Sequence, residues 1–253
     1  MKTKIILDKE INNYSDTVAY NGRIFVMGDS QLTGEVYEIN IKEKALIPKA
    51  KMLKGKFNHS LCIACKEIYS IGGWDSTTIR DCEKYSVSQN IWSALPKLKL
   101  PRAGCAAFSL NSKEIYAVGG EMYVVKSTVE RYIIANALKW DTLSIKNELC
   151  AIKNFQAIQI DESTVLAFGG DDNRKYKVYR NESQVLNIVG DVVTSVACSN
   201  MIESGAFNLT ACVVFDGENV YAVDGDKSIH IYSVVAKKWR IVKEVKEKHY
   251  LSH

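Results

Sequence analysis

A short hydrophobic segment closed by glycines recurs along the chain, and the first residues of successive copies are 44, 47, 50 and 55 residues apart. The clear copies are IYSIGG at Ile68–Gly73, IYAVGG at Ile115–Gly120 and VLAFGG at Val165–Gly170. Two weaker copies, in which an aspartate replaces a glycine, are Ile24–Asp29 and Val220–Gly225. Repeats of this length are supersecondary units that bury their apolar faces only by stacking on one another. The sequence therefore predicts a tandem array of five similar units.

Aromatic residues recur with the same period. After each copy and a polar loop comes a segment with a tyrosine, and three copies place a tryptophan seven or eight residues later. The tyrosines are Tyr37, Tyr85, Tyr132, Tyr179 and Tyr232, and the tryptophans are Trp92, Trp140 and Trp239. Leu186 stands at the expected tryptophan place of the fourth copy. This order of hydrophobic strand, glycine pair, tyrosine and tryptophan resembles the kelch repeat over about residues 12–242, most completely in the second and third copies.

Each copy divides into four short β-rich segments separated by turn residues such as Asn21-Gly22 and Asp216-Gly217. One such sheet exposes two faces, whereas sheets stacked radially cover each other and leave only short edges. The resemblance therefore implies one all-β domain over residues 1–253, a kelch-type β-propeller with five recognisable four-stranded blades. We expect the glycine pairs where a neighbouring backbone comes close and the aromatic rings between blades. The approximate repeats are 12–53, 54–100, 101–149, 150–204 and 205–245, with a tail at 246–253.

The sequence leaves open whether the ring has five or six blades. Kelch rings commonly have six or more, and residues 1–12 are too few for a further blade. We expect the segment Lys4–Leu7 to supply a strand that closes the ring against the last copy. Small residues are expected on the innermost strands, where blades crowd the axis, and they are Ala19, Cys62, Ala107, Ala157 and Cys212.

Composition argues against several classes of partner. The formal net charge is only +4, and the basic residues are scattered, so nucleic acid is not an expected ligand. No apolar run approaches the roughly 20 residues of a membrane-spanning helix, so no membrane contact is expected. Seven dispersed cysteines indicate reduced thiols and a cytoplasmic location. Cys62 and Cys65 should point to opposite faces of a strand, so we expect no metal and no cofactor.

The loops between second and third strands and the connections between blades should share one face of the ring, where loop residues are free to bind a partner. Aromatic and arginine side chains are enriched in protein interfaces. The candidate partner-binding residues on this loop face are Trp74, Arg80, Arg102, Tyr123, Arg174 and Tyr176. In kelch modules that bind peptides, the arginine that Arg102 resembles often faces the ligand. The alternative for Arg102 is that it caps a neighbouring carbonyl.

We predict a non-enzymatic module that binds a protein or peptide. The alternative is a metal-dependent or sugar-processing enzyme of the kelch type. Copper sites of that kind use two histidines with tyrosine and cysteine, and this chain has four histidines, two of them in the expected tail. No phosphate-binding or hydrolase motif occurs.

The resemblance implies two cellular settings, a substrate receptor of a ubiquitin ligase or a scaffold on the cytoskeleton. A ligase receptor should carry a dimerising or F-box domain on a longer chain, whereas a scaffold should co-sediment with filaments. The sequence indicates neither the partner, the pathway nor the oligomeric state.

Overall fold

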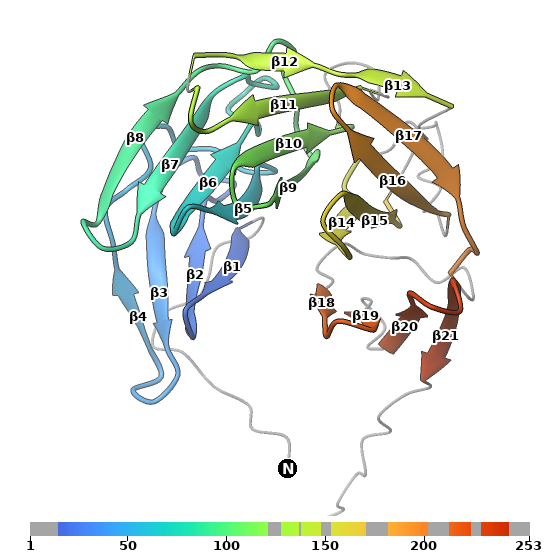
Figure 1. Cartoon of the computed structure of the whole chain (residues 1–253). Coiled ribbons are helices and arrows are strands. Elements are labelled where there is room, and N and C mark those ends of the chain that lie inside the picture. The colour runs from blue at the N-terminus through green and yellow to red at the C-terminus, as the bar shows by residue number, and fades with distance from the viewer. Residues whose placement is uncertain are drawn as a thin grey trace, which may run out of the picture.

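The computed structural model describes residues 15–120, 128–136, 138–147, 153–170, 182–201, 213–223 and 229–242. Their regular elements are β-strands, arranged as five sheets, each built on four consecutive antiparallel strands, which we number as blades 1 to 5 (Figure 1). One of these sheets also holds a fifth strand. No helix in these ranges is long and apolar enough to cross a membrane.

The strands of blade 1 are β1 (Asp16–Tyr20), β2 (Arg23–Met27), β3 (Val36–Asn40) and β4 (Ala45–Pro48). Those of blade 2 are β5 (Ser60–Ala64), β6 (Glu67–Ile71), β7 (Cys82–Ser86) and β8 (Ile91–Leu95). Those of blade 3 are β9 (Ala106–Leu110), β10 (Glu114–Val118), β11 (Val129–Ile133) and β12 (Trp140–Thr142). Those of blade 4 are β14 (Gln156–Gln159), β15 (Thr164–Phe168), β16 (Ser183–Val189) and β17 (Val192–Ala197). Those of blade 5 are β18 (Val213–Phe215), β19 (Asn219–Val223), β20 (Ile229–Ser233) and β21 (Lys238–Val242).

The blades surround an axis lined by their first strands, of which β1, β5, β9, β14 and β18 adjoin in chain order. The predicted all-β propeller with five four-stranded blades is therefore confirmed. In Figure 1 the ribbons of blade 1 and blade 5 stand further apart than those of other consecutive blades. The segment Lys4–Leu7, predicted to close the ring, lies outside the described residues, as does Cys212. Of the small inner residues, Cys62 is buried, whereas Ala19 is exposed.

Aromatic rings fill the space between blades, as the repeat predicted. The rings of Tyr85 and Trp92 in blade 2 lie 5.1 Å apart, and Tyr85 meets Phe25 of blade 1 edge-on at 6.1 Å. In blade 5, Trp239 contacts Phe168 of blade 4 at 5.1 Å. Aromatic pairs at these distances add favourable energy beyond the area that they bury. Such ring contacts join blade 2 to blade 1 and blade 5 to blade 4.

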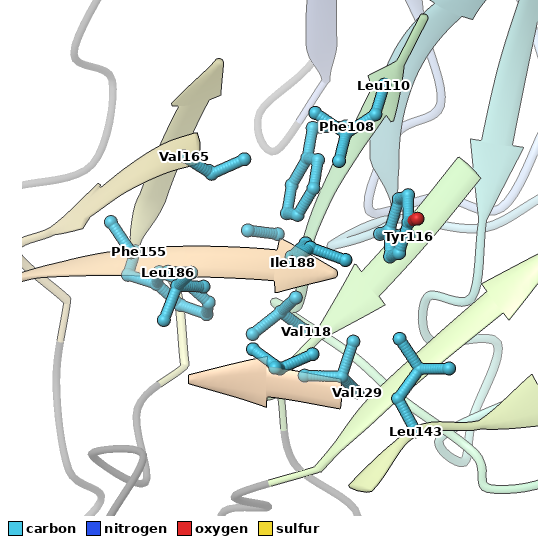
Figure 2. Close-up of a cluster of buried hydrophobic side chains, with 13 residues drawn as sticks. Phe108, Leu110, Tyr116, Val118, Val129, Leu143, Phe155, Val165, Leu186 and Ile188 are labelled. Carbon is cyan, nitrogen blue, oxygen red and sulfur yellow. The ribbon is translucent and has the colours of Figure 1, made fainter. Parts of the chain in front are cut away.

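Blade 4 corrects the predicted alignment of the repeat. Leu186 pairs with Val165, the place that Tyr85 takes opposite Ile68 in blade 2, so Leu186 replaces the tyrosine and not the tryptophan. Ser195 stands opposite Leu186, at the tryptophan place. Blade 3 supplies the aromatic surface at this interface. Figure 2 shows the resulting cluster, which includes Phe108, Tyr116, Val118, Val165, Leu186 and Ile188.

Blade 4 also carries a fifth strand that the sequence did not predict. After the short strand β12, the chain crosses to the outer edge of blade 4 as β13 (Ser144–Lys146) and pairs in parallel with β17. The crossing buries Leu143 against the cluster between blades 3 and 4. It also covers an edge strand whose backbone groups would otherwise be open to pairing.

The glycine pairs lie where the chain between blades passes close to a strand end. Gly73 has φ +117°, and a Cβ built on it would lie 3.0 Å from both the Cβ of His59 and the carbonyl oxygen of Phe57. A Cβ on Gly72 would collide with the carbonyl oxygen of Arg102. Both the left-handed conformation and the lack of space require glycine. In blade 1 Asp29 replaces the second glycine, and its carboxylate instead accepts a hydrogen bond from the Gln31 amide at 2.7 Å.

Candidate functional site

The loop between β6 and β7, residues 72–81, is bound on both sides by connections between blades. Phe57, in the connection that enters blade 2, exchanges two backbone hydrogen bonds with Trp74, at 3.1 and 2.8 Å. On the other side, the amide of Arg102, in the connection that leaves blade 2, donates to the carbonyl of Ile79 at 3.0 Å. These contacts confirm that both kinds of loop share one face of the ring. They also fix the backbone of the β6–β7 loop on both sides.

Two predicted partner-binding residues lie in this loop. Trp74 is half-buried, with its backbone fixed by Phe57, and Arg80 is exposed. Within the described residues, no ion pair engages the guanidinium of Arg80. The other candidates Tyr123, Arg174 and Tyr176 lie outside the described residues. The structure therefore brings Trp74 and Arg80 together on one loop.

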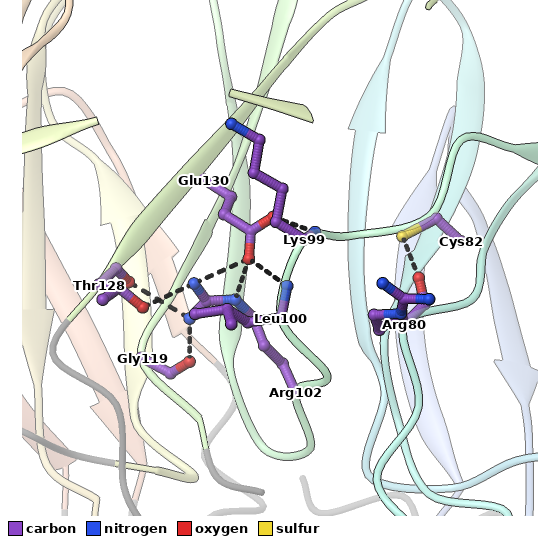
Figure 3. Close-up of polar contacts among 8 residues, drawn as sticks. All are labelled: Arg80, Cys82, Lys99, Leu100, Arg102, Gly119, Thr128 and Glu130. Atoms are coloured by element: carbon purple, nitrogen blue, oxygen red, sulfur yellow. Dashed lines mark hydrogen bonds and ion pairs between the residues drawn. The ribbon is translucent and has the colours of Figure 1, made fainter. Parts of the chain in front are cut away.

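Arg102 is completely buried, so the structure does not present it to a partner, and this candidate is corrected. Figure 3 shows its guanidinium in contact with Glu130, Gly119 and Thr128. Its Nη2 lies 3.0 Å from the Glu130 carboxylate, and its Nη1 donates to the carbonyl oxygens of Gly119 and Thr128. The alternative expectation, that Arg102 caps neighbouring carbonyls, is confirmed. The hydrogen bonds of this side chain join the connection between blades 2 and 3 to blade 3 itself.

The Glu130 carboxylate completes this anchor. It also accepts hydrogen bonds from the backbone amides of Lys99, at 2.6 Å, and Leu100, at 3.2 Å. The arrangement ties the connection between blades 2 and 3 to strand β11. Charge-assisted hydrogen bonds to a buried carboxylate are among the stronger polar contacts in proteins.

Sequence analysis missed a second anchor of the same kind. Lys56 and Glu83 are almost completely buried and lie 3.0 Å apart, and Glu83 accepts a hydrogen bond from the Leu53 amide at 2.8 Å. The signal was present, because a basic residue before the first strand and a glutamate in the third strand recur in consecutive repeats. A lysine in a loop is ordinarily exposed, so the pattern alone did not indicate burial.

Partly exposed ion pairs join the β6–β7 loop to its two flanking connections. The Nζ of Lys54 lies 2.5 Å from Asp75 and 3.6 Å from Asp81, and Lys97 lies 3.2 Å from Asp81. The hydrogen bond to Asp75 is the main cause that raises the pKa of Lys54. Burial raises the pKa of Asp81, but the hydrogen bond from Lys97 and the charge of Lys54 outweigh it, so the pKa is lowered. The Lys54 ammonium thus stays charged and pairs with both aspartates.

His59 is the histidine nearest to this loop. It is buried against Gly28 and Gly73, and neither ring nitrogen has a hydrogen-bond partner among the residues that the structure describes. Burial, with the charge of Lys56, lowers the pKa of His59 to about 3. No group of three or more His, Cys, Asp and Glu residues in the described part of the chain could hold a metal ion.

Comparisons with known proteins match the repeat. The family model of the kelch motif matches residues 56–99, which contain blade 2. The "Kelch repeat and BTB domain-containing protein 2" of cowpox virus (strain Brighton Red) is 26% identical over 54% of this chain and 25% of its own length. The ectromelia virus (strain Moscow) protein of the same name is 29% identical over 47% of this chain and 22% of its own length. "Kelch repeat protein C2" of camelpox virus (strain CMS) is 30% identical over 49% and 24%.

The matched region thus spans about a quarter of the length of these curated relatives. Among solved structures, "Structure of YjhT" superposes with a TM-score of 0.76 over 95% of this chain and 86% of that one, at 11% identity. This likeness concerns the fold alone.

Five radial four-stranded blades, glycine pairs at the second strand ends and aromatic rings between blades define a β-propeller of tandem repeats. The match of the kelch-motif model to residues 56–99 and the viral relatives support the resemblance of these repeats to the kelch repeat.

Proposed function

We propose that this propeller is a protein-interaction module whose loop face holds a protein or peptide. The carrying observation is the β6–β7 loop, which is hydrogen-bonded on both sides and carries a half-buried tryptophan, Trp74, and an exposed arginine, Arg80. Tryptophan and arginine are the residue types that most often dominate interface energies. A loop that is already ordered also loses little conformational entropy when a partner binds.

We further propose that the module recognises a substrate within a larger assembly in the cytoplasm. Two of the viral relatives carry names that join kelch repeats to a BTB domain, which supports a receptor role over a cytoskeletal scaffold. None of the relatives' names mentions an enzymatic activity. The proposed module therefore needs no cofactor and acts by binding alone.

The test is affinity capture of cellular proteins with three forms of the chain. The wild type is compared with the variant Trp74→Ala/Arg80→Ala and with a control, Leu138→Ala/Lys139→Ala, which removes an exposed apolar and an exposed basic side chain from the β11–β12 hairpin on the opposite face. Loss of a tryptophan hot spot costs about 2 kcal/mol or more, so capture should fall roughly thirtyfold. Equal capture by all three folded forms would refute the placement of the site.

A further inference from the structure

The loop end of blade 2 presents an excess of positive charge. Five basic side chains that are exposed, or more than a third exposed, gather there from the β6–β7 loop and its two flanking connections, and they are Lys51, Lys54, Arg80, Lys97 and Lys99. We call these residues, with Leu53 and Trp74, the blade-2 loop surface. The nearby carboxylates of Glu35, Asp75 and Asp81 are each within 4 Å of one of the lysines.

The ion pairs leave part of this charge without a counterion in the described chain. Asp81 is shared between Lys54 and Lys97, and the Lys97 side chain remains 60% exposed. Arg80 and Lys99 make no ion pair there, and the Lys99 side chain points away from Glu130 although its amide binds that carboxylate (Figure 3). Cations held together in this way repel each other, and an added anionic group would relieve the repulsion.

The surface also offers apolar contact beside the charges. Leu53 is 60% exposed, although its backbone amide is fixed by the buried carboxylate of Glu83 at 2.8 Å. The backbone of Trp74 is fixed by two hydrogen bonds to the backbone of Phe57 on the adjacent connection. The salt bridge between Lys54 and Asp75 links the two segments that carry these side chains. An apolar side chain of a ligand can therefore be anchored within reach of the cations.

We propose that the blade-2 loop surface recognises an acidic segment of a protein, one that carries an apolar or aromatic residue among aspartates and glutamates. This inference rests on the proposed function and names the chemistry of the partner. Carboxylates complement Arg80, Lys97 and Lys99, and the apolar residue contacts Leu53 or Trp74. A nucleic acid fits less well, because its continuous phosphates would also meet Asp75 and Asp81.

The test uses a random twelve-residue peptide library selected on the immobilised wild-type chain. Enriched peptides are then synthesised, and their affinity is measured by fluorescence polarisation at 50 and 300 mM NaCl. We expect acidic peptides with an apolar residue, bound more weakly at high salt because ions screen exposed charges. A deoxythymidine oligonucleotide serves as the nucleic-acid probe in the same assay.

Two double variants with the same change in net charge separate the site from the overall charge. Arg80→Glu/Lys99→Glu should weaken binding of the acidic peptides about tenfold or more, because each attraction becomes a repulsion. Lys42→Glu/Lys113→Glu reverses two exposed lysines in turns on the opposite face and should change binding less than about twofold. Circular dichroism checks that both variants are folded.

Several outcomes would overturn the proposal. They are enrichment of neutral or basic peptides, no enrichment, equal affinity of the two double variants, and tighter binding of the oligonucleotide than of the peptides. The proposed function fails differently. If capture of cellular proteins depends on Trp74 but the peptide selection yields no acidic sequences, only the chemistry assigned to the partner is wrong.

Discussion

The position of His59, next to the second glycine of the pair, is occupied by a different residue type in blades 2, 3 and 4. A Cβ on the second glycine of the pair would meet His59 in blade 2, Cys105 in blade 3 and Phe155 in blade 4. The site therefore accepts an apolar ring, and in the described part of the chain the imidazole of His59 gains no hydrogen bond in exchange for its burial. An unsatisfied buried polar group costs free energy, so the histidine is a weak point of the fold.

We predict that His59 makes the chain less stable in mild acid. The pKa of folded His59 is lowered to about 3, whereas an unfolded histidine titrates near 6.5. Between these values the unfolded state binds the additional proton, so the contribution of His59 to the free energy of unfolding falls as the pH falls. From pH 7 to pH 5 this contribution should drop by about 2 kcal/mol. Urea unfolding at pH 7 and pH 5 measures this change in the free energy of unfolding. The variant His59→Phe, which has no imidazole to titrate, should not show it. Parallel pH profiles for the two proteins would contradict the prediction.

At the scale of elements, the connections between blades depend on buried ion pairs. Removing one partner of such a pair leaves an uncompensated charge and typically costs about 3–5 kcal/mol. We expect this loss in the free energy of unfolding for Arg102→Met, which strands the Glu130 carboxylate. The double variant Arg102→Met/Glu130→Gln should recover part of it. The matched control is Lys97→Met, which removes an exposed cation and should cost less than about 1 kcal/mol. Similar losses for Arg102→Met and Lys97→Met would show that the buried pair has no anchoring role.

The strands were more predictable than the connections. A glycine pair or a tryptophan has a steric reason to recur at one place, so the period located the blades and placed Trp74 and Arg80 on the loop face. The strand β13 could not be foreseen, because three residues carry no hydrophobic period. The burial of Arg102 depends on Glu130, a partner 28 residues later in the chain, and local sequence does not reveal such a pairing.

At the scale of the whole molecule, the two faces of blade 5 differ in how far the described residues cover them, and we call the less covered face the open face. Val220 faces blade 4 and is fully buried. The other face carries Val214, which pairs with Tyr221, and also Val223 and Val242. These three valines are 53%, 36% and 42% exposed, respectively. Within a stack of blades, such a face is normally half of an interface.

This asymmetry predicts how valine-to-alanine variants rank in thermal or urea unfolding. Val220→Ala should lower the free energy of unfolding by about 2 kcal/mol, because it leaves a cavity between blades 4 and 5. Val214→Ala and Val223→Ala should each cost less than about 0.5 kcal/mol. If Lys4–Leu7 closes the ring against blade 5, as the sequence predicts, the loss of unfolding free energy on the open face should instead be large. A strand packed there would cover Val223, and its truncation would then cost nearly as much as that of Val220. A loss of that size in Val223→Ala, abolished when residues 1–7 are deleted, would establish closure by the N-terminal strand and refute an open face.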